Sequence, residues 1–265
     1  MMIIDCHHHL GSQSDYVNKL VGECERLKID KVCLMGLPEF EGSSSNSQIK
    51  EAVQSYPDLF VGFAFADLRM IIPDDIDRFK EEGFRGLKFI YPPANYDDEK
   101  FDRIYQRAED LGMIALFHLG IVARSEQKNP YRINSNYMKP IYLDTIARCF
   151  PKLSIIGAHL GNPWYEEATM SARWNPNLYF DLSGSTLKKK TPEFLGGLLW
   201  WTPTTRYRDP ERRYAWDKIV FGSDVPYNEI EEVMTDYKRV LDALKIDKEI
   251  QDKVFGGTMA KILEV

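Results

Sequence analysis

The sequence of 265 residues lacks the features that mark several special classes of protein. No run approaches the roughly 18 consecutive apolar residues of a membrane-spanning helix. The N-terminus has no cationic segment followed by a long apolar stretch, so we expect no signal peptide. The net charge is −6, which argues against a nucleic-acid or anionic-membrane partner bound through a broad basic surface. The sequence therefore predicts a cytoplasmic protein that acts on small molecules.

Cysteine and histidine are both scarce. The four cysteines show no C-x-x-C pairing, and we interpret all of them as buried, reduced thiols; they are Cys6, Cys24, Cys33 and Cys149. Only five histidines occur, and three of them stand together in the segment IIDCHHHLG, residues 3–11. A tag is an unsuitable explanation, because the triplet has only three members and lies within a strand pattern.

Short apolar runs rich in β-branched residues alternate with longer segments of helical periodicity. Eight such runs occur, at 2–11, 31–38, 60–68, 85–92, 113–120, 153–161, 178–185 and 218–227. Strands that alternate with helices form βαβ units and a parallel sheet. Eight units in this length predict a single domain over residues 1–265, folded as a (β/α)₈ TIM barrel. A doubly wound open sheet is the second choice, because no G-x-G-x-x-G turn follows the first strand.

The segments between these runs carry helix and loop signals. Amphipathic patterns predict helices at 16–28, 74–82, 99–111 and 137–150. Pro73 is typical of a helix start, and Gly83 and Gly112 are typical of helix ends. The stretch 42–48 reads as a polar loop, and 186–217 reads as a long irregular segment over or beside the active-site face.

Polar residues gather at the predicted C-terminal ends of the strands, where the active sites of such barrels lie. They include all five histidines and are His7, His8, His9, Lys88, His118, His159, Asp181, Ser183 and Asp224. A single histidine is more often a structural residue than a metal ligand. If all five were structural residues, their position at the same end of the barrel would be a coincidence. Imidazole and carboxylate groups suit Zn²⁺ and similar divalent ions. The pattern therefore predicts a metal site at this end.

Strand alternation divides the histidine triplet. Side chains at positions i and i+2 share one face of a strand. His7 and His9 are therefore expected to point into the barrel mouth, and His8 to point out towards the helices. The same alternation places Asp5 on the inward face one layer lower, where it would orient a ligand or fill the polar base of the site.

The chain resembles the amidohydrolase superfamily in four places. IDCHHH is similar to the I-D-x-H-x-H opening of that superfamily, and LFHLG, IGAHLG and FGSDVP are similar to its signatures on strands five, six and eight. The likeness is greatest to the amidohydrolase-related group, which includes aminocarboxymuconate-semialdehyde decarboxylase and the 2-pyrone-4,6-dicarboxylate lactonases. The C-terminal tail departs from the family pattern, because Thr258 stands where an asparagine is expected.

The resemblance implies a role for each matching residue. One divalent metal ion would be bound by His7, His9, His118 and Asp224, with Zn²⁺ favoured and Mn²⁺ as the alternative. His159 would stand beside the ion and contact its water or the substrate, and Asp224 would act as the general base for that water. Binuclear members carry a carbamylated lysine on strand four, so Lys88 permits a second ion, although one ion is favoured.

Candidates for substrate binding are less specific. The cation of Arg124 could pair with a substrate carboxylate, and Lys88 could contact the substrate as a free amine. Tyr91 and Trp164 could form walls for a flat organic molecule, although aromatic residues are as often simple packing. Together with the arginines of the 186–217 segment, these candidates favour an anionic substrate. A homodimer is compatible with the sequence.

Three interpretations of function follow. The first is a metal-dependent hydrolase that uses a metal-activated water on a lactone, ester or amide, with Asp224 as general base. The second is a non-oxidative decarboxylase of a small aromatic or unsaturated carboxylic acid, which needs the same ligands. The H-x-H on the first strand favours hydrolysis, because several aromatic decarboxylases of the family replace its first histidine. A non-enzymatic metal-binding barrel is the third, and the presence of Asp224 and His159 argues against it.

Overall fold

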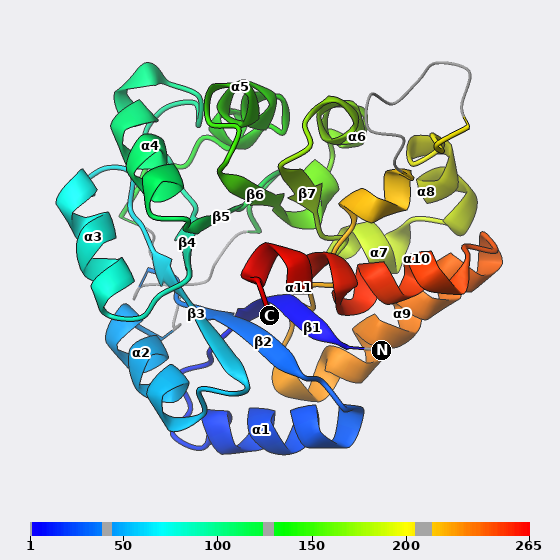
Figure 1. Cartoon of the computed structure of the whole chain (residues 1–265), viewed down its shortest axis with the longest axis horizontal. Coiled ribbons are helices and arrows are strands. Elements are labelled where there is room, and N and C mark those ends of the chain that lie inside the picture. The colour runs from blue at the N-terminus through cyan, green and yellow to red at the C-terminus, as the bar shows by residue number, and fades with distance from the viewer. Residues whose placement is uncertain (1, 39–43, 124–129, 205–213) are drawn as a thin grey trace.

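The computed structural model describes residues 2–38, 44–123, 130–204 and 214–265. Seven parallel strands in these ranges form one sheet in chain order, and helices surround it (Figure 1). The strands are β1 (Ile4–His9), β2 (Lys31–Met35), β3 (Phe60–Phe65), β4 (Gly86–Phe89), β5 (Ile114–Phe117), β6 (Ser154–Gly157) and β7 (Leu178–Phe180). The α-helices are α1 (Tyr16–Leu27), α2 (Asn46–Ser55), α3 (Pro73–Glu81), α4 (Asp102–Asp110), α5 (Ile141–Cys149), α6 (Tyr165–Trp174), α7 (Ser185–Lys189), α8 (Pro192–Leu198), α9 (Ile230–Ala243), α10 (Lys248–Asp252) and α11 (Thr258–Leu263).

The eighth position of the ring is filled by residues 219–224, which have only a single parallel bridge to β7. The amide of Val220 donates to a β7 carbonyl over 3.0 Å, and the carbonyl of Phe221 accepts from a β1 amide over 2.9 Å. The Ser223 amide donates to the Asp5 carboxylate instead of to a β1 carbonyl, and the Asp224 amide then donates to the carbonyl of His7 over 2.8 Å. The predicted barrel class is confirmed, and its eighth strand is reduced to these links between β7 and β1.

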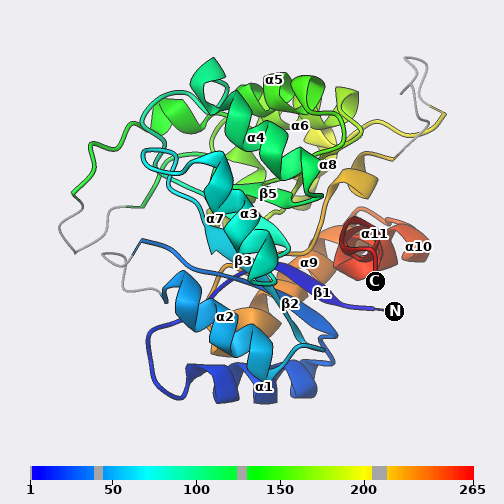
Figure 2. The same cartoon turned by 60° about the vertical axis from the view of Figure 1, so that its left-hand side comes forward.

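The end of the barrel at the start of the strands is closed by α11, which lies beside the N-terminus (Figure 2). Met259 and Leu263 of α11 pack against the apolar side chains that fill the barrel interior. These include Ile4, Cys6, Cys33, Phe63, Ile114, Leu116, Ile156 and Val220. Burying one such large apolar side chain stabilises a fold by about 1.5–3 kcal/mol. With this end sealed by apolar contacts, the polar strand ends lie at the opposite mouth.

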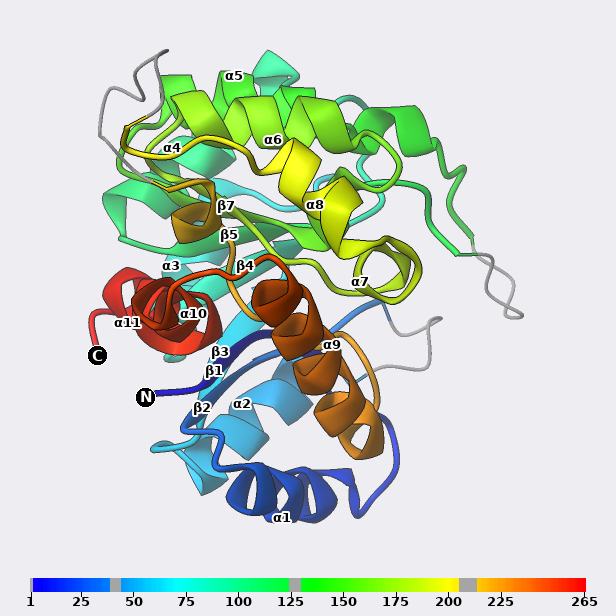
Figure 3. The same cartoon turned by 90° about the vertical axis from the view of Figure 1, so that its right-hand side faces the viewer.

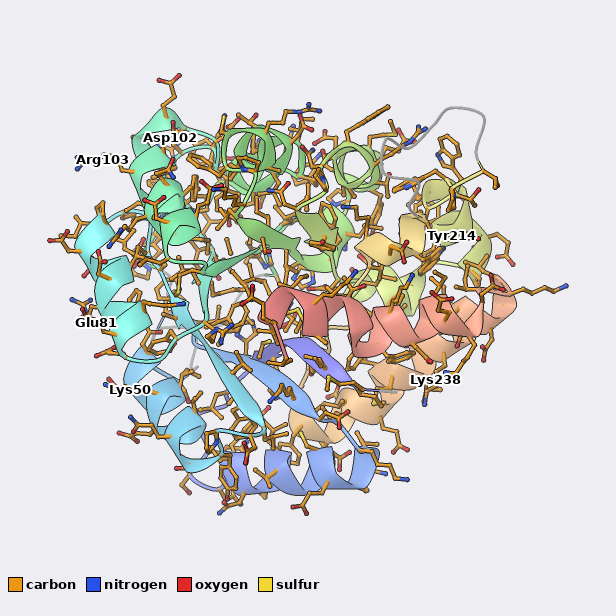
Figure 4. The ribbon with its side chains drawn as sticks, in the orientation of Figure 1. Lys50, Glu81, Asp102, Arg103, Tyr214 and Lys238 are labelled. Carbon is orange, nitrogen blue, oxygen red and sulfur yellow. The ribbon has the colours of Figure 1, made fainter. Side chains whose placement is uncertain are left out.

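A second apolar layer lies between the outer face of the sheet and the helices, where Leu20, Leu87 and Tyr105 are buried. Charged side chains occupy the other side of the helices; Glu81, Arg103 and Lys238 point outward from them (Figure 4). Within the described ranges, no helix combines the length and the apolar character needed to cross a bilayer.

Most helix boundaries follow the signals in the sequence, but the helix predicted at 137–150 begins only at Ile141, and two loop predictions also need correction. α3 begins at Pro73, and Gly83 and Gly112 follow their helices with φ of 92° and 60°. The polar stretch 42–48 is not all loop: Ser45 and Gln48 form a capping box that starts α2. The segment 186–217 is not irregular throughout either, because it contains α8 and most of α7.

The cysteine interpretation needs one correction. Cys6, Cys24 and Cys33 are buried free thiols, as predicted, but Cys149 at the end of α5 is exposed. Burial raises the pKa of Cys24 to about 12, so that thiol stays protonated.

Candidate metal centre

β1 changes register between Asp5 and His8. Asp5 pairs with Val32 of β2 and His8 pairs with Leu34, so three steps along β1 face two steps along β2. An extra residue of this kind reverses which side chains share a face. Asp5 therefore lies on the outer side, with Oδ2 3.7 Å from Nδ1 of His8. The prediction that it shares the inward face with His7 is wrong.

The predicted division of the three histidines is confirmed. The Nε2 atoms of His7 and His9 converge to 3.2 Å. His8 points the other way, where its Nε2 lies 3.0 Å from the hydroxyl of Tyr16 on α1 and its Nδ1 lies 3.1 Å from Oγ of Ser223. One strand thus supplies two imidazoles to the mouth and one to the helix layer.

The partners of the two inward imidazoles determine their tautomers. Nδ1 of His7 lies 2.9 Å from Oδ2 of Asp181, and Nδ1 of His9 lies 3.3 Å from the carbonyl oxygen of Met35. A carbonyl oxygen and an ionised carboxylate can only accept hydrogen bonds. In each imidazole Nδ1 is therefore the atom that carries the proton. Both Nε2 atoms therefore present lone pairs to the same point. Two lone pairs this close suit a shared cation, and the donor set fits a divalent metal ion.

Asp224 brings a carboxylate to the same point. Its Oδ1 lies 3.6 Å from Nε2 of His7 and 3.4 Å from Nε2 of His9. In the described part of the chain, these three residues form a group whose ligand atoms all lie within 4.8 Å of one another. His7 is fully buried, whereas the side chains of His9 and Asp224 are 21% and 22% exposed, so solvent reaches the group from their side.

His159 faces the second oxygen of this carboxylate, with Nε2 3.7 Å from Oδ2 of Asp224. Its Nδ1 lies 2.9 Å from Oγ of Ser183, whose hydroxyl donates to Oδ1 of Asp181. Because the Ser183 proton is used in that bond, its oxygen accepts the proton on Nδ1 of His159. Nε2 of His159 therefore also carries a lone pair, directed at Asp224.

Asp181, at the end of β7, connects these imidazoles. It accepts from the side chain of His7, from the amide of His159 and from the amide of Ser183. Burial alone would raise the pKa of Asp181, but the neighbouring His7 and these hydrogen bonds hold it below its ordinary value. Sequence reasoning placed Asp181 at the strand end without giving it a role. The D-x-S spacing after the strand, which lets the carboxylate bind the later amide, was the available signal.

His118, the predicted fourth ligand, lies against His159 with ring centroids 5.0 Å apart. Its Nε2 is buried and has no hydrogen-bond partner among the described residues, although His118 is not in the three-residue group. Burial lowers the pKa of His9, His118 and His159, which keeps these imidazoles neutral as metal ligands must be. The position of His118 is compatible with a ligand role, which stays a prediction.

Lys88 reaches the centre from β4. Its Nζ lies 2.8 Å from Nε2 of His7, to which it donates, and its side chain is 1% exposed. Burial lowers its pKa to about 8, against the attraction of Asp224 and Asp181. Lys88 is therefore an inner residue of the centre. The contact to His7 shows that the lone pair of this Nε2 faces a position where a cation is accommodated.

The remaining substrate candidates are Tyr91, Trp164 and Arg124. Tyr91 follows β4 and is buried with its ring edge towards Tyr131, at a centroid distance of 6.3 Å. Trp164 is half-buried at the start of α6, with Nζ of Lys139 5.2 Å from its ring centroid. Arg124 lies outside the described residues. The part of these three residues in substrate binding stays a prediction.

Several non-glycine residues at this end of the barrel have a positive φ. Tyr91, His159 and Asp224 have φ of 58°, 62° and 48°, a region that residues with a side chain seldom adopt. Each follows a different strand position of the ring. Strain of this kind persists where surrounding contacts hold it, and it gathers at functional sites.

The fold and the centre together define a parallel (β/α)₈ barrel with an imidazole and carboxylate donor set at the C-terminal end of its strands. The amidohydrolase family model matches residues 39–265, and the chain belongs to this family. No match was found among the curated proteins.

Solved structures share the fold along the whole chain. An uncharacterized TIM-barrel protein from Bordetella bronchiseptica has a TM-score of 0.73 at 17% identity, over 100% of this chain and 99% of that one. A probable 2-pyrone-4,6-dicarboxylic acid hydrolase from Acinetobacter baumannii, with citric acid bound, has a TM-score of 0.68 at 16% identity, over 100% of both chains. A 5-carboxyvanillate decarboxylase from Novosphingobium aromaticivorans, with bound manganese, has a TM-score of 0.66 at 14% identity, over 100% and 97%. At these identities the likeness establishes the fold.

Proposed function

We propose that this chain is a metal-dependent hydrolase that cleaves a lactone, ester or amide bond in a small anionic substrate. The observation that carries the proposal is the convergence of two imidazole lone pairs, on Nε2 of His7 and His9, with the Asp224 carboxylate. The group lies at the end of the barrel where enzymes of this fold work, and solvent reaches it. Membership of the amidohydrolase family supports the proposal.

His7, His9 and Asp224 would hold one divalent ion, and His118 would supply a fourth ligand. Nitrogen and oxygen donors of this kind favour Zn²⁺, with Mn²⁺ as the alternative. Bound there, the ion would lower the pKa of a water from about 15.7 towards 7 and polarise the substrate carbonyl. The Lys88 amine donates to Nε2 of His7 and would have to give way there to any ion. One ion is favoured over two, because a second ion would also need Lys88 as a carbamate.

Asp224 and His159 would accept and transfer the proton of the attacking water. The Asp224 carboxylate would accept it from the attacking water and would hold it at Oδ2, which faces Nε2 of His159. Because Nε2 of His159 carries a lone pair, it can accept the proton itself or accept a hydrogen bond from the protonated Asp224. The proton is then passed to the leaving group. A positioned acid–base group of this kind contributes about 10²–10⁴-fold to a rate.

A non-oxidative decarboxylase of a small aromatic or unsaturated carboxylic acid is the second candidate. It is favoured by the likeness in fold to 5-carboxyvanillate decarboxylase, whose structure contains manganese. The same donor set would then gather the substrate carboxylate and a neighbouring oxygen. Asp224 or His159 would deliver a proton to the carbon that loses CO₂.

A substrate screen separates the two candidates. Metal-free protein is loaded with Zn²⁺ or with Mn²⁺ and is tested with lactones and with hydroxybenzoates. Release of acid from a lactone supports the hydrolase proposal. Release of CO₂ from a hydroxybenzoate would show that the protein is a decarboxylase instead. The Asp224→Asn variant is measured in parallel; full turnover with metal still bound would show that Asp224 is not the base.

Metal analysis tests the number of ions. One equivalent per chain is expected, with Lys88 as a free amine. Two equivalents, together with a carbamate signal from Lys88 after incubation with ¹³C-labelled bicarbonate, would establish a binuclear centre instead.

We also propose a cytoplasmic location and a small-molecule substrate, with no nucleic-acid or membrane partner. The buried free thiols Cys6, Cys24 and Cys33 support a reducing compartment. A homodimer is compatible with this proposal. Light scattering of the purified protein measures the oligomeric state directly.

A further inference from the structure

His8 is the one histidine of the triplet that the metal centre does not use. Its side chain is fully buried on the outer side of β1, and both of its ring nitrogens lie at hydrogen-bond distance from a side chain. Nε2 lies 3.0 Å from the Tyr16 hydroxyl, and Nδ1 lies 3.1 Å from Oγ of Ser223. Ser223 immediately precedes Asp224, so His8 contacts the segment that carries the proposed base.

The second partner of His8 leads back to the same segment. The amide of Tyr227 donates to the hydroxyl oxygen of Tyr16 over 3.2 Å, and the two tyrosine rings meet edge to face at 5.2 Å. Tyr227 begins the short helix η6 (Tyr227–Glu229), which packs on α1 where α9 starts (Figure 3). Three hydrogen bonds, from Tyr227 to Tyr16, between Tyr16 and His8, and between His8 and Ser223, thus form a ring that the backbone of 223–227 closes.

The donors in this ring run in one direction. Because the Tyr227 amide donates to the Tyr16 oxygen, the Tyr16 hydroxyl is free to donate to Nε2 of His8. Nδ1 of His8 then carries the ring proton and donates to Oγ of Ser223. The amide of Ser223 donates to Oδ1 of Asp5 over 2.9 Å. Every link has a donor and an acceptor, as a buried polar network requires.

Segment 223–227 includes Asp224, one of the residues of the centre with a strained backbone. Asp224 has a φ of 48°, and its amide donates to the carbonyl of His7 over 2.8 Å. Residues with a side chain leave this conformation when neighbouring contacts no longer hold it. The ring ties Ser223 on one side of Asp224 and Tyr227 on the other, so it holds the backbone from which the carboxylate reaches the imidazoles.

We propose that His8 and Tyr16 are positioning residues that clamp segment 223–227 and aim the Asp224 carboxylate at the metal centre. The proposal rests on the proposed role of Asp224. It also accounts for Gly11 at the end of the HHHLG motif: a Cβ there would lie 2.5 Å from Cδ2 of Tyr16. Only a residue without a side chain leaves room for the Tyr16 ring.

Two measurements on the full chain test the clamp. The first is amide hydrogen exchange of the metal-free protein, followed on peptides that cover 223–227. The second is titration with Co²⁺, which reports affinity and, through its visible absorption, the geometry of the ligands. Tyr16→Phe removes only the hydroxyl, and Tyr105→Phe is the matched control. Tyr105 is also buried, and its hydroxyl donates to the carbonyl of Tyr96, away from segment 223–227.

Tyr16→Phe is expected to speed exchange in 223–227, to weaken Co²⁺ binding by about tenfold and to change the Co²⁺ spectrum. His8→Asn keeps a donor near Ser223 but loses the link to Tyr16, so it should give the same changes. The double variant should be little worse than either single variant, since both break one ring. Tyr105→Phe should leave the exchange of 223–227 and the Co²⁺ spectrum as in the wild type.

Asp224→Asn separates this proposal from the proposed function. If Asp224→Asn leaves Co²⁺ affinity and spectrum unchanged, Asp224 is not a ligand and the proposed function fails. If Asp224→Asn alters the spectrum but Tyr16→Phe and His8→Asn behave like Tyr105→Phe, the clamp is overturned and the metal centre stands. Amide exchange of 223–227 that is unchanged in both Tyr16→Phe and His8→Asn would also overturn the clamp, and this measurement needs no metal.

Discussion

The two ends of the barrel are built on the same strands but have opposite characters. At the closed end, Ile4 and Cys6 of β1 join an apolar core that α11 seals. At the open end, further along the same strand, His7 and His9 present lone pairs to a carboxylate. A single strand of six residues therefore contributes to stability at one end and to chemistry at the other.

The ends also differ in how completely their groups are satisfied. The open end holds the strained residues Tyr91, His159 and Asp224, and the buried Nε2 of His118 has no partner in the described part of the chain. Groups of this kind reduce stability unless a ligand completes them. The comparison teaches that the closed end should control folding and the open end should control metal binding. Four substitutions test this division, taken from the largest expected effect on the centre to the smallest.

His7→Ala should abolish metal binding. The change removes one of the two converging Nε2 atoms and also the partner of Asp181. His8→Ala, on the adjacent residue, should lose only about tenfold in affinity, because its imidazole faces away from the centre. Zn²⁺ titration by calorimetry measures both variants. Equal losses would contradict the division of the triplet by strand alternation.

Asp224→Asn should lower kcat by about 10²–10⁴-fold once a substrate is known, because the amide cannot accept a proton from water. The thermal stability of the metal-free variant should change little, since the side chain is partly exposed. Steady-state kinetics at saturating metal provide the test. A KM effect with unchanged kcat would assign Asp224 to substrate binding instead of proton transfer.

Asp181→Asn should weaken metal affinity by about 10–100-fold without removing a ligand. The carboxylate holds His7 in the tautomer whose Nε2 faces the centre, and an amide group could present a donor there instead. Asp30→Asn is the control at the opposite end, where the carboxylate accepts from the amide of Ile3. Competition against a chromophoric Zn²⁺ chelator compares the two, and similar affinities would leave Asp181 without a role in the centre.

Leu263→Ala should have the smallest effect on the centre and a large effect on folding. Removing this buried side chain leaves a cavity beneath the barrel interior, which costs about 2–5 kcal/mol of unfolding free energy. Urea denaturation of the metal-free protein measures that loss, and Zn²⁺ titration under native conditions should match the wild type. A clear loss of metal affinity in the folded variant would show that the two ends are coupled.

Local patterns in the sequence were sufficient for the barrel class and for part of the centre. Alternating apolar runs and amphipathic segments indicated the βα units, because each pattern depends only on the periodicity of one element. The pairing of His7 with His9 depended only on strand alternation over three residues. The same argument failed for Asp5, because the register of β1 shifts between Asp5 and His8. A register irregularity depends on the partner strand and leaves no mark in the letters of β1.

The sequence by itself determined which groups are available at the mouth, because residue type and strand position place imidazoles and carboxylates at one edge of a parallel sheet. Only the tertiary structure decided how they act together. Asp181 reaches His7 across 174 positions of the chain, and His8 reaches Ser223 across 215. These contacts arise because the ring closes residues 219–224 against β1, and distances along the chain cannot show which side chains then meet. Barrel closure therefore turns a list of polar strand ends into a group of imidazoles and carboxylates with defined orientations.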